Sequence, residues 1–176
     1  MTYFPTHKAS VLECAAMPTE QKITPHLWFD REAKEAAEFY VSVFSSRGTA
    51  RIKSVTTLRN TPSGDADAVV FELLGQEFMA ISAGPLFKFN EAISFVVQCD
   101  SQEEIDDYWS KLAADPAAGQ CGWIKDKYGL SWQITPRVLG RMLQDEDPAK
   151  VARVTQAFLK MKKFDLAALQ RAYDGK

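Results

Sequence analysis

Histidine is the side chain most often used as a general acid or base, and this sequence contains only two, His7 and His26. His26 lies within the short apolar and aromatic run Ile23–Phe29, two residues before Trp28. In that setting His26 could act as a general base. The alternative is that it is a hydrogen-bonded wall residue with no part in catalysis. The choice depends on what His26 faces, and therefore on the elements that position it.

The three cysteines, Cys14, Cys99 and Cys121, indicate neither a disulfide framework nor a zinc site built on thiolates. Their number is odd, and no C-x-x-C motif occurs. We expect Cys99 to be a buried small hydrophobe. Cys121 has no histidine near it in the sequence, which argues against nucleophilic catalysis.

The sequence also lacks the glycine-rich motifs that hold nucleotide-like cofactors. Neither a P-loop nor a G-x-G-x-x-G motif occurs, and the first strand-to-helix turn, Phe29–Glu32, contains no glycine. The G-x-S-x-G motif of serine hydrolases is absent as well. We therefore predict no cofactor.

The composition is that of an ordinary globular protein. The chain has 176 residues, of which 46% are hydrophobic and 25% are charged, and its net charge is −2. Such a charge provides no basic field for nucleic acid or for an anionic membrane surface, and no apolar run approaches the ~20 residues of a membrane-spanning helix. We expect no nucleic-acid partner, no membrane partner and a cytoplasmic location.

Hydrophobic periodicity divides the chain into strands and helices after an N-terminal extension, residues 1–21, that we expect to be mobile. Asp30 is the expected N-cap of a first helix, and Ser101 with Glu104 forms a capping box for a second. After Pro136 the pattern is helical to the end of the chain, and Asp147 and Asp165 are the expected N-caps of the last two helices. The expected strands are Ile23–Phe29, Arg51–Leu58, Ala68–Leu74, Glu77–Ser82, Ile93–Cys99, Cys121–Lys125 and Leu130–Thr135.

The two halves of this pattern repeat each other. A shift of 70 positions places Asp100 on Asp30 and Trp109 on Phe39. The final hairpins correspond too, since the segment from Gly75 to Ala80 matches that from Gly129 to Ile134. The alternative is that strand–helix–strand units simply look alike. The conserved order of cap, helix face and hairpin favours a duplicated unit.

A duplicated unit of this size resembles the glyoxalase, or vicinal oxygen chelate, superfamily, and several motifs narrow the resemblance to the PhnB-like proteins. The resemblance runs from Lys22 to about Ala172. The family is often labelled 3-demethylubiquinone-9 3-methyltransferase, a label that the residues themselves do not support. The motifs are ITPHLWFD at Ile23–Asp30, Phe39-Tyr40, KFNEAISF at Lys88–Phe95, GWIKDKYG at Gly122–Gly129, Trp132–Ile134 and Met161–Lys163.

This resemblance implies an α+β fold of two βαβββ modules, of the glyoxalase/bleomycin resistance/dioxygenase type, with extra C-terminal helices. The modules would span residues 22–90 and 91–136, and the helices would span 137–176. The strands would form a half-open cup, either within one chain or by exchange between two chains. A homodimer is expected, because open sheets leave edges and apolar rims to cover.

The resemblance also implies which side chains face the cup, because neighbouring residues of a strand alternate between its two faces. Leu27, Phe29, Val97 and Cys99 would pack on the helices, and Trp132 would lie in the core. The positions of metal ligands in the superfamily would be held by Thr24, Met79, Ser94 and Gln133. The expected ligand-binding set is Thr24, His26, Trp28, Met79, Ser94, Gln98, Trp123 and Gln133, with His26 as the one catalytic candidate.

The four superfamily metal positions offer two hydroxyls, a thioether and an amide, none of which is ionisable. Divalent metals require carboxylate, imidazole or thiolate ligands at most positions, so we predict no tightly bound metal. The expected function is the binding of a small molecule in the cup, with any reaction left open. The alternatives are a metal-dependent lyase or dioxygenase with unusual ligands, and the methyltransferase of the family label. The polar segment Lys125–Tyr128 is expected to be a solvated hairpin tip.

Overall fold

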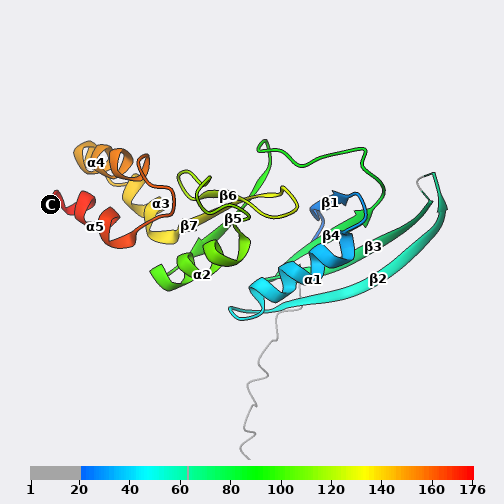
Figure 1. Cartoon of the computed structure of the whole chain (residues 1–176). Coiled ribbons are helices and arrows are strands. Elements are labelled where there is room, and N and C mark those ends of the chain that lie inside the picture. The colour runs from blue at the N-terminus through cyan, green and yellow to red at the C-terminus, as the bar shows by residue number, and fades with distance from the viewer. Residues whose placement is uncertain (1–20, 63) are drawn as a thin grey trace, which may run out of the picture.

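The computed structural model describes residues 21–62 and 64–176, and it contains two small sheets and five helices in these ranges (Figure 1). The predicted N-terminal extension, with His7 and Cys14, lies outside the described residues apart from Gln21. No helix in the described residues is long and apolar enough to cross a membrane. The elements are β1 (His26–Phe29), α1 (Ala33–Phe44), β2 (Ala50–Thr61), β3 (Gly64–Leu73), β4 (Gln76–Ser82), β5 (Ser94–Cys99), α2 (Gln102–Leu112), β6 (Trp123–Lys125), β7 (Ser131–Pro136), α3 (Arg137–Leu143), α4 (Pro148–Phe158) and α5 (Leu166–Asp174).

The first half of the chain forms the expected βαβββ module. Its four strands lie in the order β1-β4-β3-β2, with β1 parallel to β4 and the other pairs antiparallel. Helix α1 is amphipathic and buries one face, which consists of Ala33, Ala36, Ala37, Tyr40, Val43 and Phe44.

The prediction that Asp30 caps α1 is wrong. The helix begins two residues later, and its N-cap residue, Glu32, makes no side-chain cap hydrogen bond. The free N–H of Ala33 donates instead to Ser82 Oγ (3.1 Å), which the end of β4 places at the start of the helix. The cap therefore comes from a residue 49 positions away, which local sequence patterns cannot reveal.

The second half repeats the unit with one strand fewer. Its three strands lie in the order β5-β7-β6, and α2 connects β5 to β6. Ser101 caps α2 as expected, since its side chain accepts from the N–H of Glu104. Where the βαβββ pattern would place a further strand, residues 113–122 form a loop, in which the Asp115 side chain accepts from the N–H of Ala117 (2.9 Å).

Strand pairing confirms the internal repeat. In the first sheet Leu27 of β1 lies opposite Ala80 of β4, and in the second sheet Val97 of β5 lies opposite Ile134 of β7. These are the residues that the two sequence matches place on each other. The two-module α+β fold with C-terminal helices is thus present, and both modules share the parallel pairing of their first and last strands.

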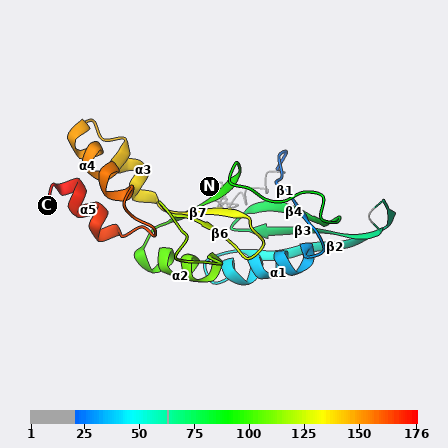
Figure 2. The same ribbon diagram turned by 45° about the horizontal axis from the view of Figure 1, so that its top comes forward.

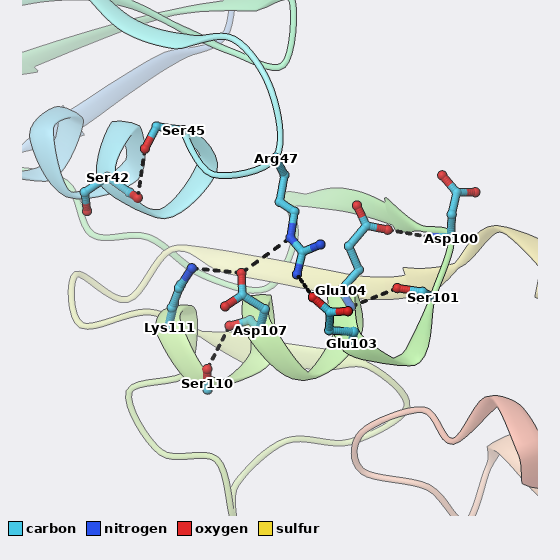
Figure 3. Close-up of polar contacts among 10 residues, drawn as sticks. All are labelled: Ser42, Ser45, Arg47, Asp100, Ser101, Glu103, Glu104, Asp107, Ser110 and Lys111. Atoms are coloured by element: carbon cyan, nitrogen blue, oxygen red, sulfur yellow. Dashed lines mark hydrogen bonds and ion pairs between the residues drawn. The ribbon is translucent and has the colours of Figure 1, made fainter.

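The modules are joined on the side where α1 and α2 lie next to each other (Figures 1 and 2). Arg47, which follows α1, forms ion pairs with Glu103 (2.9 Å) and Asp107 (3.8 Å) of α2 (Figure 3). Beneath this polar contact the aromatic core is continuous, since Phe78 of β4 packs edge-on against Phe95 of β5 with ring centroids 5.1 Å apart.

A buried carboxylate also ties the modules together, and it corrects the expectation of a solvated hairpin tip. Asp126, between β6 and β7, is only 2% exposed. It accepts hydrogen bonds from Tyr40 Oη of α1 (2.7 Å), Trp132 Nε1 (2.8 Å) and the backbone N–H groups of Tyr128 and Leu130. Burial raises the pKa of the Asp126 carboxyl, and the donated hydrogen bonds act in the opposite direction.

The three C-terminal helices dock on the second module. Asp147 and Asp165 cap α4 and α5, as the sequence predicts. Gln102, at the start of α2, donates to the carbonyl of Phe164 (3.1 Å) and accepts from the N–H of Leu166 (2.9 Å). Phe164 itself is buried, so this junction holds the helices against the core rather than leaving them as a separate unit.

Candidate functional site

The sheets have one face covered by α1 and α2 and one that the two helices leave uncovered; we call the latter the open face. Along β1 the alternation is as expected, because Leu27 and Phe29 are buried whereas His26 is exposed and Trp28 is half-buried. On β4, Phe78 and Ala80 are buried and Met79 between them is 37% exposed. The predicted facing of these side chains in the first module is therefore confirmed.

The second module follows the same rule. Val97 and Cys99 of β5 are buried, and Ser94, Val96 and Gln98 lie on the opposite face. On β7, Trp132 is in the core, as predicted, and Gln133 is half-buried on the open face beside β6. The open face of this module carries Ser94, Val96, Gln98, Trp123, Lys125, Ser131 and Gln133.

The structure brings the predicted site residues together in two groups. His26 and Met79 are opposite each other in the first sheet. In the second sheet Gln133 lies between β5 and β6, where it is paired with Val96 and Trp123, and its Nε2 donates to Ser94 Oγ (2.8 Å). Thr24 precedes β1 and is half-buried.

The aromatic and amide candidates line separate hollows. Trp28 donates from Nε1 to the carbonyl of Gly84 (2.8 Å) and packs edge-on against Phe87 in a groove of about 490 Å³. Gln98 borders a cavity of about 430 Å³ between the modules, and Trp123 borders one of about 440 Å³ beside β6. A single molecule of ordinary size would contact one of these hollows and the adjoining part of the open face.

The donor set does not fit a catalytic divalent metal. The four positions that the sequence resemblance marks as metal ligands are Thr24, Met79, Ser94 and Gln133, and the last two are already hydrogen-bonded to each other. Among the described residues no group of three or more His, Cys, Asp or Glu side chains could hold a metal ion. Neutral hydroxyl, thioether and amide donors compensate poorly for the hydration that a divalent cation loses on binding.

Two other groups, Cys99 and Glu91, are not available for nucleophilic or acid–base chemistry. Burial raises the pKa of the Cys99 thiol to about 12, which keeps it protonated at physiological pH. Glu91, whose pKa is lowered by the hydrogen bond from the Lys125 ammonium, forms an ion pair with that lysine beside Trp123. Neither group has the free, activated form that nucleophilic or acid–base chemistry requires.

The sequence reasoning missed Ser131, which lines the cavity beside Trp123. Its hydroxyl is buried and has no hydrogen-bond partner among the described residues. The signal was present, because Ser131 precedes the core residue Trp132 on β7 and so shares a face with Gln133.

Comparison with known proteins then gives the family. The family described as 3-demethylubiquinone-9 3-methyltransferase matches residues 21–135. The chain belongs to this family. A PhnB protein from Bacillus cereus that carries the same methyltransferase name is 36% identical, with a TM-score of 0.55, and the match covers 66% of this chain and 99% of that one.

A second solved structure supports the fold alone. Protein PA1353 from Pseudomonas aeruginosa is 18% identical with a TM-score of 0.51, and the match covers 66% of this chain and 98% of that protein. No match is found among proteins of curated function. Helices α3, α4 and α5 lie beyond the residues that the family matches, so they add to the PhnB-like module pair.

Proposed function

We propose that this PhnB-like chain binds a small organic molecule on the open face of its sheets and that it does so without a tightly bound metal. The observation that supports the proposal is the uncharged character of the side chains at the superfamily metal positions. Ser94 and Gln133 form a neutral hydrogen-bonded pair, and Met79 lies exposed beside His26. Neutral polar groups flanked by apolar surface are typical of organic-ligand sites.

His26 is the one histidine among the described residues, and its imidazole lies on this face, where it could take up a proton from a bound molecule. It is exposed and adjoins Met79, so a bound molecule could reach its imidazole. A reaction at this site would use His26 as the general base, with the substrate positioned by its neighbours on β1 and β4.

The methyltransferase activity in the family's name is a second candidate, favoured by the family match itself. It would require a site for a nucleotide-like methyl donor. The turn between β1 and α1 is Asp30-Arg31-Glu32, which presents side chains rather than the glycine backbone that cradles such cofactors. Calorimetric titration with S-adenosylmethionine decides this point, and saturable micromolar binding would favour the second candidate over the first.

We also propose that two copies of the chain associate through the open face. Met79 is 37% exposed and Val96 is 49% exposed there, and both belong to strands at or near a sheet edge. Contact with a second copy would remove this apolar surface from water and complete the walls around a bound molecule.

The binding proposal is tested by nuclear magnetic resonance on ¹⁵N-labelled protein dialysed against a chelator. Small uncharged organic molecules from a library should shift backbone amide signals of the open-face strands, which are β1 and β4 in the first module and β5, β6 and β7 in the second. Substituting Met79→Glu should reduce the shifts in the first module, and the matched control Glu38→Gln on the exposed side of α1 should change none of them. Shifts confined to α3–α5, or shifts that appear only when a divalent metal is restored, would contradict the proposal.

A further inference from the structure

A cavity of about 440 Å³ lies along β6, bounded by the loop that follows α2. The N–H of Ala114 donates to the carbonyl of Lys125 (2.9 Å) at one end of β6. At the other end Gln120 and Trp123 exchange backbone hydrogen bonds of 3.2 and 2.9 Å. The loop is thus fastened at both ends of the strand, and the cavity lies between it and the sheet.

The outer side of this loop is also fixed. Lys162 Nζ, in the segment before α5, donates to the carbonyl of Ala117 (2.6 Å), and Gln120 Nε2 donates to that of Leu159 (2.9 Å). Gly119 packs so closely on the Trp109 ring that a Cβ there would lie 2.5 Å from it. The loop is held by the core on one side and by the C-terminal segment on the other, so the cavity exists before a ligand binds.

The wall of this cavity includes one polar group without a partner among the described residues, the Ser131 hydroxyl. Ser131 is 1% exposed and lines the cavity, and its Oγ has no hydrogen-bond partner among the described residues. Burying a hydroxyl without a partner is unfavourable, and in native proteins such a group calls for an explanation such as a bound molecule or an ordered water. A hydroxyl can both donate and accept, so it suits a ligand oxygen of either kind.

The charged groups around the cavity already have partners. The Lys125 ammonium is paired with Glu91, and Asp115 accepts from the N–H of Ala117. A charged ligand would have to break one of these contacts. Gln120 also lines the cavity, and its amide already donates to the carbonyl of Leu159. The rest of the lining is the half-buried Trp123 together with Ala114, Ala118, Gly119 and Ile124.

We propose that this cavity binds an uncharged aromatic molecule that carries one hydroxyl or carbonyl oxygen. The ring packs against Trp123, and the oxygen forms a hydrogen bond with the Ser131 hydroxyl. The volume falls within the range of small-molecule sites and suits one or two fused rings. This proposal rests on the proposed function and deepens it, because it names the ligand class and the part of the second module that holds it.

The test uses 4-ethylphenol and ethylbenzene, two probes that differ only in the hydroxyl, titrated into the full-length protein with detection by nuclear magnetic resonance. Wild type should bind 4-ethylphenol about tenfold more tightly than ethylbenzene, the effect of one neutral hydrogen bond. Ser131→Ala should abolish this difference and leave ethylbenzene binding unchanged. Trp123→Leu should weaken both probes, and the exposed-serine control Ser110→Ala should change neither. Circular dichroism confirms that each variant is folded.

Several outcomes would overturn the proposal. Equal affinity of wild type for the two probes, or no binding of either at millimolar concentration, would show that the Ser131 hydroxyl forms no hydrogen bond with the probe. Binding that survives Ser131→Ala with its tenfold preference intact would place the oxygen elsewhere. If Trp28→Leu abolishes binding while Trp123→Leu does not, the molecule occupies the first module, so the proposed function stands and this cavity is not its site.

Discussion

Replacing Asp126 should destabilise the protein more than replacing any exposed aspartate. The carboxylate is 2% exposed and accepts from four donors. Asp126→Ala would leave four buried donors without an acceptor, at about 1–3 kcal/mol each. A loss of roughly 4 kcal/mol or more is a large part of the 5–15 kcal/mol that stabilises a typical domain. That variant is therefore expected to accumulate poorly, and the quantitative test needs a milder change.

Asp126→Asn is that milder change. Its amide oxygen can still accept from the backbone N–H groups of Tyr128 and Leu130, whereas its NH₂ group would face Tyr40 and Trp132. The tyrosine hydroxyl can rotate to accept, but the indole N–H cannot, so one buried donor is lost and two donors oppose each other. We expect the free energy of unfolding to fall by about 2 kcal/mol.

The assay is equilibrium unfolding in urea, followed by circular dichroism and tryptophan fluorescence. The matched control is Asp30→Asn, an exposed aspartate in the turn before α1, which should change the unfolding free energy by less than about 0.5 kcal/mol. A double-mutant cycle with Tyr40→Phe should show coupling, because the two side chains share a hydrogen bond of 2.7 Å. An Asp126→Asn variant as stable as the control would refute the role of this carboxylate in joining the modules.

Three further predictions concern other parts of the molecule. Ser131→Ala should raise the free energy of unfolding by about 1 kcal/mol, because it removes a buried hydroxyl that has no partner among the described residues. Ser82→Ala should lower it by about 1 kcal/mol, because the N–H of Ala33 loses its acceptor. Urea unfolding that ranks the two variants in the opposite order would contradict both assignments. Cys99, with a thiol pKa of about 12, should resist iodoacetamide at pH 8 in the native protein and react after unfolding; mass spectrometry showing rapid native labelling would contradict its burial. Sedimentation at micromolar concentration should show a dimer that Val96→Lys converts to monomer, and a monomeric wild type would rule out the proposed association.

Local sequence patterns were sufficient to predict on which face of a strand each side chain lies. Residues of a strand alternate between its faces, and Leu27 and Phe29 on one side of β1 with His26 and Trp28 on the other needed no tertiary information. The internal repeat carried the same assignment to Val97 and Cys99 of β5. The capping box of α2 and the N-caps of α4 and α5 were equally local.

What the sequence could not show depends on partners far along the chain. The segment Lys125–Tyr128 has the composition of a solvated turn, and the contact of Asp126 with Tyr40, 86 positions earlier, cannot be seen in it. The cap of α1 likewise comes from a distant residue, because Ser82 lies 49 positions from Ala33. The cavity beside Trp123 needs the loop after α2, which is held in part by distant residues, Leu159 and Lys162.

The metal content of the purified protein tests the central claim most directly. The protein is produced in medium supplemented with iron, manganese, nickel and zinc, dialysed, and measured by elemental analysis. The donors Thr24, Met79, Ser94 and Gln133 carry no charge, so we predict well under one metal ion per chain. A stoichiometric metal that disappears in Gln133→Ala or His26→Ala would contradict the account, because the open face would then be a metal site.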